Sequence, residues 1–118
     1  MFEADDIRNW RGESVVDDGG HKIGTLEAVY VDTVSDLPSF ATVTMGMAGR
    51  RRLAFVPLRG AQVGPRYLKV SFDKRTVKAA PAIGTDDELP ATEEPAVFAH
   101  YDLTYQPGSQ GERRLARR

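Results

Sequence analysis

The sequence contains 118 residues and no cysteine, so it suits one compact domain with short tails and excludes a disulfide framework and a thiolate metal site. Its formal net charge of −1 hides an uneven distribution: residues 1–40 carry a net charge of −6, residues 41–80 of +8 and residues 81–118 of −3. The acidic start lacks the apolar run of a secretory signal, and no window has the length of a membrane-spanning helix. We therefore expect a soluble cytoplasmic protein without an integral membrane segment.

The chain begins with a predicted helical lead-in over residues 1–12. Ile7 and Trp10 lie three positions apart, which places them on one face of a helix, and Asp5 suits an N-cap position. A short strand is predicted next, at Ser14–Val16.

A longer strand is predicted over Lys22–Asp32, and its alternation of apolar residues is imperfect. Ile23 faces one side together with the later valines, whereas Leu26 belongs to the other side. A change of face within one strand indicates a bulge or strong coiling, which Gly24 permits. Strong coiling is what a small closed or nearly closed sheet requires.

Three further extended segments follow, separated by turns rich in glycine, aspartate and proline. Residues 40–46 and 51–58 each alternate apolar side chains between two faces, and residues 67–72 show the cleanest alternation of all. Residues 59–65 are predicted to form a loop. Five or six short strands at this spacing indicate an all-β barrel or sandwich.

The last third of the chain is predicted to be mostly irregular. One helical turn is expected around Val77, followed by a polar linker over residues 82–91. A short helix is predicted over residues 92–103, with Thr92 as its N-cap and two glutamates in its first turn. Residues 104–118 have low hydrophobicity and are predicted to form a flexible basic tail.

The turn between the first two strands contains Asp17, Asp18 and His21, which are residue types that also bind metals. A calcium loop needs further oxygen ligands at alternating positions and a closing glutamate, and neither follows here. Glycines accept the backbone angles of tight turns, and aspartate side chains satisfy turn amides. We therefore favour a structural turn over a metal site.

The chain resembles PRC-barrel domains in the order of four segments, which are WRGESVVDDGGHKIGTLEAVYVD, LPSFATVTMG, RRLAFVPLRGA and YLKVSFDKRTVKAAP. The resemblance covers roughly residues 7–81. It rests on the glycine turn before KIG, the apolar strand that ends in aspartate, the motif FVPL and the closing DK..VK.AP. The later segment LPATEEPAVFAHYDL is similar to one found after the barrel in actinobacterial members, with Asp102 where a glycine usually follows the His-Tyr pair.

This resemblance implies a mainly β protein: a small, strongly bent antiparallel β-barrel over residues 1–81, with a short N-terminal helical turn and a short C-terminal helix. The same fold forms the cytoplasmic domain of the photosynthetic reaction centre H subunit and part of a ribosome maturation factor. Those relatives use the barrel to bind protein or ribonucleoprotein partners. The resemblance therefore implies a non-catalytic module for protein binding or self-assembly, in an assembly or stress setting.

The residues themselves offer little for catalysis. His100 is the second of two histidines, and we favour a boundary side chain over a pH-sensing or ligand role. The serines form no Gly-x-Ser-x-Gly elbow, and the glycine turns open no long helix of the P-loop type. We expect no enzyme activity, no cofactor and no bound metal.

The consecutive cations Arg50, Arg51 and Arg52 are the candidate anion- or partner-binding residues, because three adjacent arginines cannot all point inward. Other cations could extend this positive surface: Arg59, Arg66, Lys69, Lys74, Arg75 and Lys78. We favour compensation by acidic strands of the same sheet over a partner site. An RNA- or ribosome-associated role is the alternative function, although Tyr67 is the only plausible stacking aromatic.

Exposed strand edges in a small barrel are usually covered or paired. A second copy of the chain would pair with such an edge, so a homodimer is the expected oligomeric state.

Overall fold

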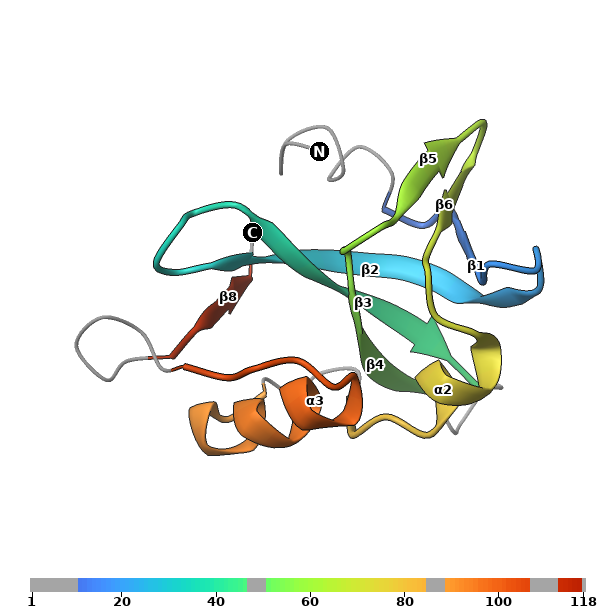
Figure 1. Ribbon diagram of the computed structural model, residues 1–118. Coiled ribbons are helices and arrows are strands. Elements are labelled where there is room, and N and C mark those ends of the chain that lie inside the picture. Colours follow the sequence, from blue (N-terminus) through green and yellow to red (C-terminus); the bar gives the residue numbers. More distant parts are fainter. Residues whose placement is uncertain (1–10, 47–50, 85–88, 107–112, 118) are drawn as a thin grey trace.

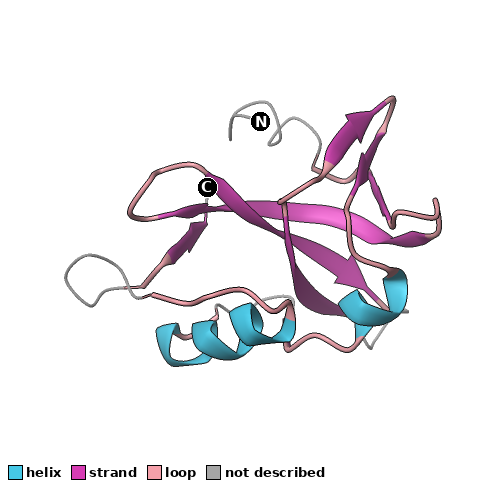
Figure 2. Ribbon diagram, in the orientation of Figure 1, coloured by secondary structure: helices cyan, strands magenta, loops and turns pink. Residues whose placement is uncertain are grey.

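A mixed sheet of eight strands, packed against two short helices, forms the body of the protein (Figure 1, Figure 2). The computed structural model describes residues 11–46, 51–84, 89–106 and 113–117, so the predicted lead-in lies almost entirely outside the described residues. The strands are β1 (Ser14–Val16), β2 (Lys22–Asp32), β3 (Pro38–Met45), β4 (Arg52–Pro57), β5 (Gln62–Gly64), β6 (Tyr67–Lys69), β7 (Ala82–Gly84) and β8 (Leu115–Arg117). The helices are α2 (Lys74–Lys78) and α3 (Glu94–His100), the latter preceded by a 3-10 turn, η1 (Ala91–Glu93).

The strands follow the order β5-β6-β1-β2-β3-β4-β7. Strand β2 is the centre of this arrangement: β3 pairs along one edge, while β1 and β8 pair with opposite ends of the other edge. The prediction of a mainly β fold is confirmed. The sheet is not closed, however, because β5 and β7 end the path without pairing with each other.

The prediction of an entirely antiparallel barrel is wrong, because β1 and β6 are parallel neighbours. The β5–β6 hairpin returns the chain so that β6 runs beside β1 in the same direction, and the amide of Val70 continues the ladder by donating to Val16 O at 2.9 Å. The predicted loop over residues 59–65 therefore contains a strand. Arg66, with a φ of 65°, forms the tight turn that closes this hairpin.

The predicted irregularity of β2 is confirmed, but its effect differs from the prediction. The register shifts opposite β1 near Ile23 and opposite β3 between Leu26 and Ala28. Each extra residue resets the alternation of the strand. As a result Ile23, Leu26 and Val29 all contribute to one apolar cluster, so the prediction that Leu26 faces away from Ile23 is wrong.

Two apolar clusters fill the two sides of the central strands. Ala41, Val43 and Met45 of β3 belong to the first cluster and Phe40 to the second, which confirms the predicted alternation. Val77, which is fully buried, closes the first cluster from α2, as predicted. The second cluster lies under α3 and contains the side chains Phe40, Phe55, Val97, Phe98, Tyr101 and Leu115.

Several segments predicted to be irregular are ordered by long-range pairing. Within the predicted linker 82–91, Ala82–Gly84 forms β7, which pairs with β4. Leu115–Arg117, within the predicted flexible tail, forms β8 on β2 because Leu115 is buried in the second cluster. The helix predicted over residues 92–103 is shorter than expected, and Thr92 lies inside the 3-10 turn instead of capping α3.

Because of two tyrosines in the second cluster, we expect the fold to lose stability at high pH. The Tyr101 hydroxyl donates to Phe55 O at 2.6 Å, and burial raises its pKa far above the ordinary value of 10. Burial, followed by the hydrogen bond to Glu94, raises the pKa of Tyr105 to about 12. Because both folded-state pKa values exceed the unfolded value, this stabilisation is complete below pH 10 and is lost as the pH rises above 10.

Urea unfolding at pH 8, 10 and 11 measures this effect. The free energy of unfolding is expected to fall above pH 10, by up to about 1.4 kcal/mol per pH unit for Tyr101. The Tyr101→Phe chain, which cannot ionise at this position, should show a shallower fall. Equal pH dependence in the two chains would contradict the assignment to Tyr101.

Candidate functional site

Asp17 organises the turn between β1 and β2. Its carboxylate accepts hydrogen bonds from the backbone amides of Gly19 at 3.0 Å and His21 at 2.8 Å, while the amide of Asp17 donates to His21 O at 2.9 Å. The turn interpretation of this stretch is therefore confirmed. No cluster of three or more potential metal ligands occurs among the described residues.

The same carboxylate has a second role that sequence reasoning missed. Asp17 Oδ2 accepts the backbone amide of Lys74 at 3.0 Å, which ties the first turn of α2 to the β1–β2 hairpin. Burial raises the pKa of Asp17, but the amide donors of His21, Lys74 and Gly19 together with the His21 ring lower it, so the net shift is downward. The two residues are 57 positions apart in the chain, so no local pattern could have indicated the contact.

His100, the last residue of α3, is half-buried, as expected of a boundary side chain. Its Nε2 lies 2.7 Å from Thr76 O, and its ring meets that of Tyr101 edge-on with centroids 4.9 Å apart. This contact connects the two helices on one side of the sheet.

The two candidate arginines that the structure describes have different surroundings. Arg50 lies outside the described residues, and Arg51 is exposed at the entrance to β4. Arg52 donates from its guanidinium to Lys78 O at 2.8 Å, which satisfies a carbonyl at the C-terminal end of α2. Arg52 therefore helps to stabilise the fold.

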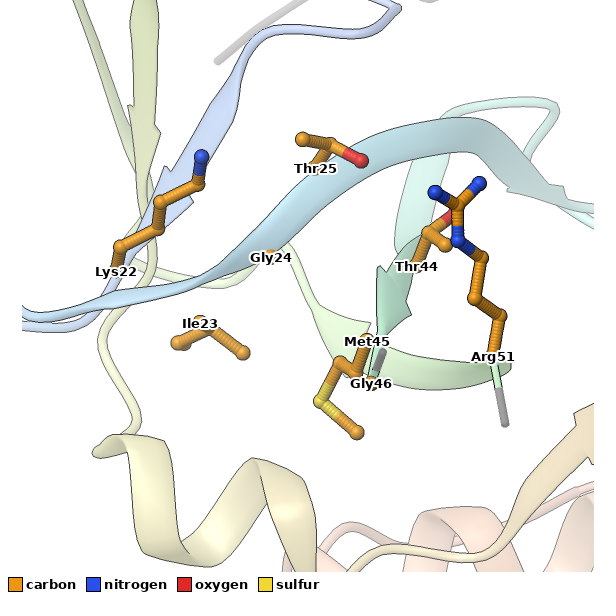
Figure 3. Close-up of a pocket in the computed structure, with 8 residues that line it drawn as sticks. All are labelled: Lys22, Ile23, Gly24, Thr25, Thr44, Met45, Gly46 and Arg51. Carbon is orange, nitrogen blue, oxygen red and sulfur yellow. The ribbon is translucent and has the colours of Figure 1, made fainter. Parts of the chain in front are cut away.

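A pocket of about 380 Å³ opens where β2 and β3 separate. The last residues paired between the two strands are Thr25 and Thr44, and the pocket lies beyond them. Figure 3 shows the amino group of Lys22 and the guanidinium of Arg51 on its two flanks. The opening is therefore bordered by two cations from different elements.

A second pocket, of about 430 Å³, adjoins the first and shares Ile23, Met45 and Gly46 with it. Ile23 and Met45, which are both buried, point toward α2 (Figure 3) and separate the two pockets. We call the cations around both pockets the basic end, and they are Lys22, Arg51, Arg52, Lys74 and Lys78.

Carboxylates near the basic end lie beside its pockets: Asp17 accepts the amide of Lys74, and Asp73 precedes Lys74 as the N-cap of α2. The ion pairs of Arg114 with Asp32 and of Arg117 with Glu27 lie outside both pockets. No acidic or aromatic described residue lines either pocket. Such an arrangement attracts anionic groups.

Glu94 is the polar residue of greatest consequence that sequence reasoning missed. It is completely buried at the start of α3, where the sequence suggested only a favourable helix-dipole position. Its carboxylate accepts the Tyr105 hydroxyl and the backbone amides of Arg114 and Leu115 at 2.8–2.9 Å. Glu94 directly follows Glu93 in the sequence, so no local signal distinguished the buried glutamate from the exposed one.

The open mixed sheet, with cationic pockets at one of its ends, defines a small β-rich domain. The PRC-barrel domain family matches residues 2–77, and the chain belongs to this family, as its resemblance indicated. PRC-barrel domains serve in protein interaction and assembly and are generally non-catalytic. The curated proteins contain no match to the chain. No helix in the described ranges is both long enough and apolar enough to cross a membrane.

Proposed function

We propose that this PRC-barrel protein is a non-catalytic module that binds an acidic segment of another protein at the basic end. The observation that carries the proposal is the group of cations around Ile23 and Met45. Carboxylates of a partner would approach these cations, while Ile23 and Met45 belong to the buried core beneath them. Electrostatic complementarity of this kind steers association and gives specificity.

RNA binding through the predicted Arg50–Arg52 face is the second candidate, because guanidinium groups also bind phosphate. Proteins that bind single-stranded RNA usually stack bases on aromatic side chains, and no described aromatic residue lines either pocket. Titration with structured RNA at two salt concentrations separates the candidates, because phosphate contacts produce a steep salt dependence. Absence of binding at low salt would eliminate the RNA candidate.

Charge reversal at the pocket tests the protein-binding proposal. The Lys22→Glu/Arg51→Glu chain and the wild type are used to capture partners from nuclease-treated extract of the native cell, with quantification by mass spectrometry. We expect capture of the acidic partner to fall at least tenfold, because two favourable charge pairs become repulsive. Purified partner then gives the dissociation constant for each chain.

A matched charge reversal elsewhere provides the control. Arg59 and Arg66 are exposed and lie outside both pockets, so Arg59→Glu/Arg66→Glu changes the net charge equally without altering the basic end. This chain should capture the partner like the wild type. Equal losses in both variants would mean that only overall charge matters and would refute a specific site.

We also propose that the protein self-associates as a homodimer. Strands β5 and β7 end the sheet, and Val63 of β5 is 38% exposed. Unpaired edges with exposed apolar side chains favour association with another strand. Sedimentation that shows only monomer at high protein concentration would refute the homodimer.

A further inference from the structure

The C-terminal strand β8 occupies a site built from elements far away in the sequence. It pairs antiparallel with β2, with Asp32 opposite Leu115 and Val31 opposite Ala116. The pairing continues beyond β8, because the amide of Thr33 donates to Arg114 O at 2.8 Å. Figure 1 shows β8 beside the end of β2 that lies away from β1.

Glu94 of α3 fixes the start of this strand from the side. Its two carboxylate oxygens accept the successive backbone amides of Arg114 at 2.8 Å and Leu115 at 2.9 Å. The third donor is the Tyr105 hydroxyl, which lies in the segment that follows α3. A buried carboxylate requires such donors, so removal of β8 together with Arg114 would leave Glu94 with one of these three hydrogen bonds.

The site also recognises the side chains of the strand. Leu115 is 1% exposed within the apolar cluster under α3. Arg114 Nε donates to Asp32 Oδ1 at 2.7 Å, and Arg117 forms an ion pair with Glu27. The acceptor therefore selects an extended segment in which basic residues flank a leucine.

Strand β8 lies outside the residues that match the PRC-barrel family. Strand β2 belongs to the matched residues 2–77, whereas α3 and β8 both lie beyond them. The edge of the PRC-barrel domain is thus covered by an extension that supplies both the strand and the carboxylate holding it. The partners of β8 are β2 and Glu94, so a β8 from a second copy would meet the same partners, which is the condition for exchange between copies.

We propose that the β2 edge and Glu94 form a strand-acceptor site that binds β8 of a second copy as well as its own β8, so that two copies join by exchanging C-terminal strands. The inference rests on the self-association part of the proposed function. A second copy is the occupant because it carries the same order of arginine and leucine that the site contacts. Every hydrogen bond and ion pair described above would then re-form between the two chains.

Trapping by a disulfide tests the exchange directly, because the natural chain contains no cysteine. Val31 and Ala116 face each other across β2 and β8, and directly opposed residues of antiparallel strands have Cβ atoms close to disulfide range. The Val31→Cys chain and the Ala116→Cys chain are unfolded, refolded together at millimolar concentration and oxidised. We expect a disulfide-linked heterodimer at several times the dimer yield of either chain alone.

The acceptor is tested by a second substitution in the Val31→Cys chain. Glu94→Gln removes the charge and one acceptor oxygen and should lower the heterodimer yield several-fold. Glu93→Gln, the matched change at the exposed neighbouring residue, should leave the yield unchanged. A yield that Glu94→Gln does not lower would overturn the assigned site.

The double variant Val31→Cys/Ala116→Cys is the positive control, and it should close its disulfide within one chain. Closure in this control without heterodimer in the mixture would overturn the exchange. Failure of closure would also overturn it, because β8 would then not lie on β2. Sedimentation of the wild type separates the two proposals: a dimer without exchange retains self-association through another surface, whereas a monomer without exchange refutes both.

Discussion

Replacement of Glu94 by alanine is expected to lower the free energy of unfolding by about 3 kcal/mol. The substitution leaves two backbone amides of the C-terminal strand and the Tyr105 hydroxyl without their acceptor in a buried environment. Each unsatisfied buried donor costs about 1–3 kcal/mol, and the removal of a buried charge offsets part of this cost. Urea unfolding measures the change, and the melting temperature should fall by roughly 10 °C.

Glu93→Ala provides the matched control for this prediction. Glu93 precedes Glu94, is exposed and makes no side-chain cap hydrogen bond. Its replacement should change the free energy of unfolding by no more than about 0.5 kcal/mol. If the two alanine variants were equally stable, the Glu94 carboxylate would not be what holds β8 against the sheet.

Substitution of Gly24 by alanine is the second change expected to have a large effect. A Cβ atom at this position would lie 2.1 Å from Thr44 O and 2.9 Å from Cγ1 of Val43. The backbone oxygen cannot move without disturbing the β2–β3 ladder, in which the neighbouring Thr25 pairs with Thr44. We expect a loss of about 3 kcal/mol in the free energy of unfolding, at the upper end for overpacking.

Gly19→Ala separates this close approach from the general effect of replacing a glycine. The nearest atom to a Cβ at Gly19 is Cε1 of His21, at 3.0 Å, and the exposed His21 ring can turn away. The change in the free energy of unfolding should therefore stay within about 1 kcal/mol. Similar losses at Gly19 and Gly24 would show that the strands do not constrain Gly24.

Because Gly24 also lines the pocket at the basic end, Gly24→Ala should weaken partner binding as well.

The sequence predicted much of the local structure, because local chemistry determines it. Alternation placed Phe40 on the opposite side from Ala41, and the turn chemistry of Asp17 located the β1–β2 hairpin. One helical turn was predicted with Val77 as its apolar contact, and α2, in which Val77 is buried, confirms it. Within the candidate site, the sequence indicated the arginine cluster but not the pocket that Lys22 and Arg51 share.

The sequence by itself determined the fold family, through the order of its motifs along the chain. It also determined the regularly alternating strands and the turns, because these depend on residues close together in the chain. Only the tertiary structure decided which distant residues meet: Asp17 with Lys74, and Glu94 with the amides at the start of β8. It also gave the two described arginines different contacts. Arg52 donates a hydrogen bond to α2 and lines the second pocket, whereas Arg51 lines the first pocket. These contacts depend on strand register and on the need to satisfy buried polar groups, which arise only when the whole sheet is assembled.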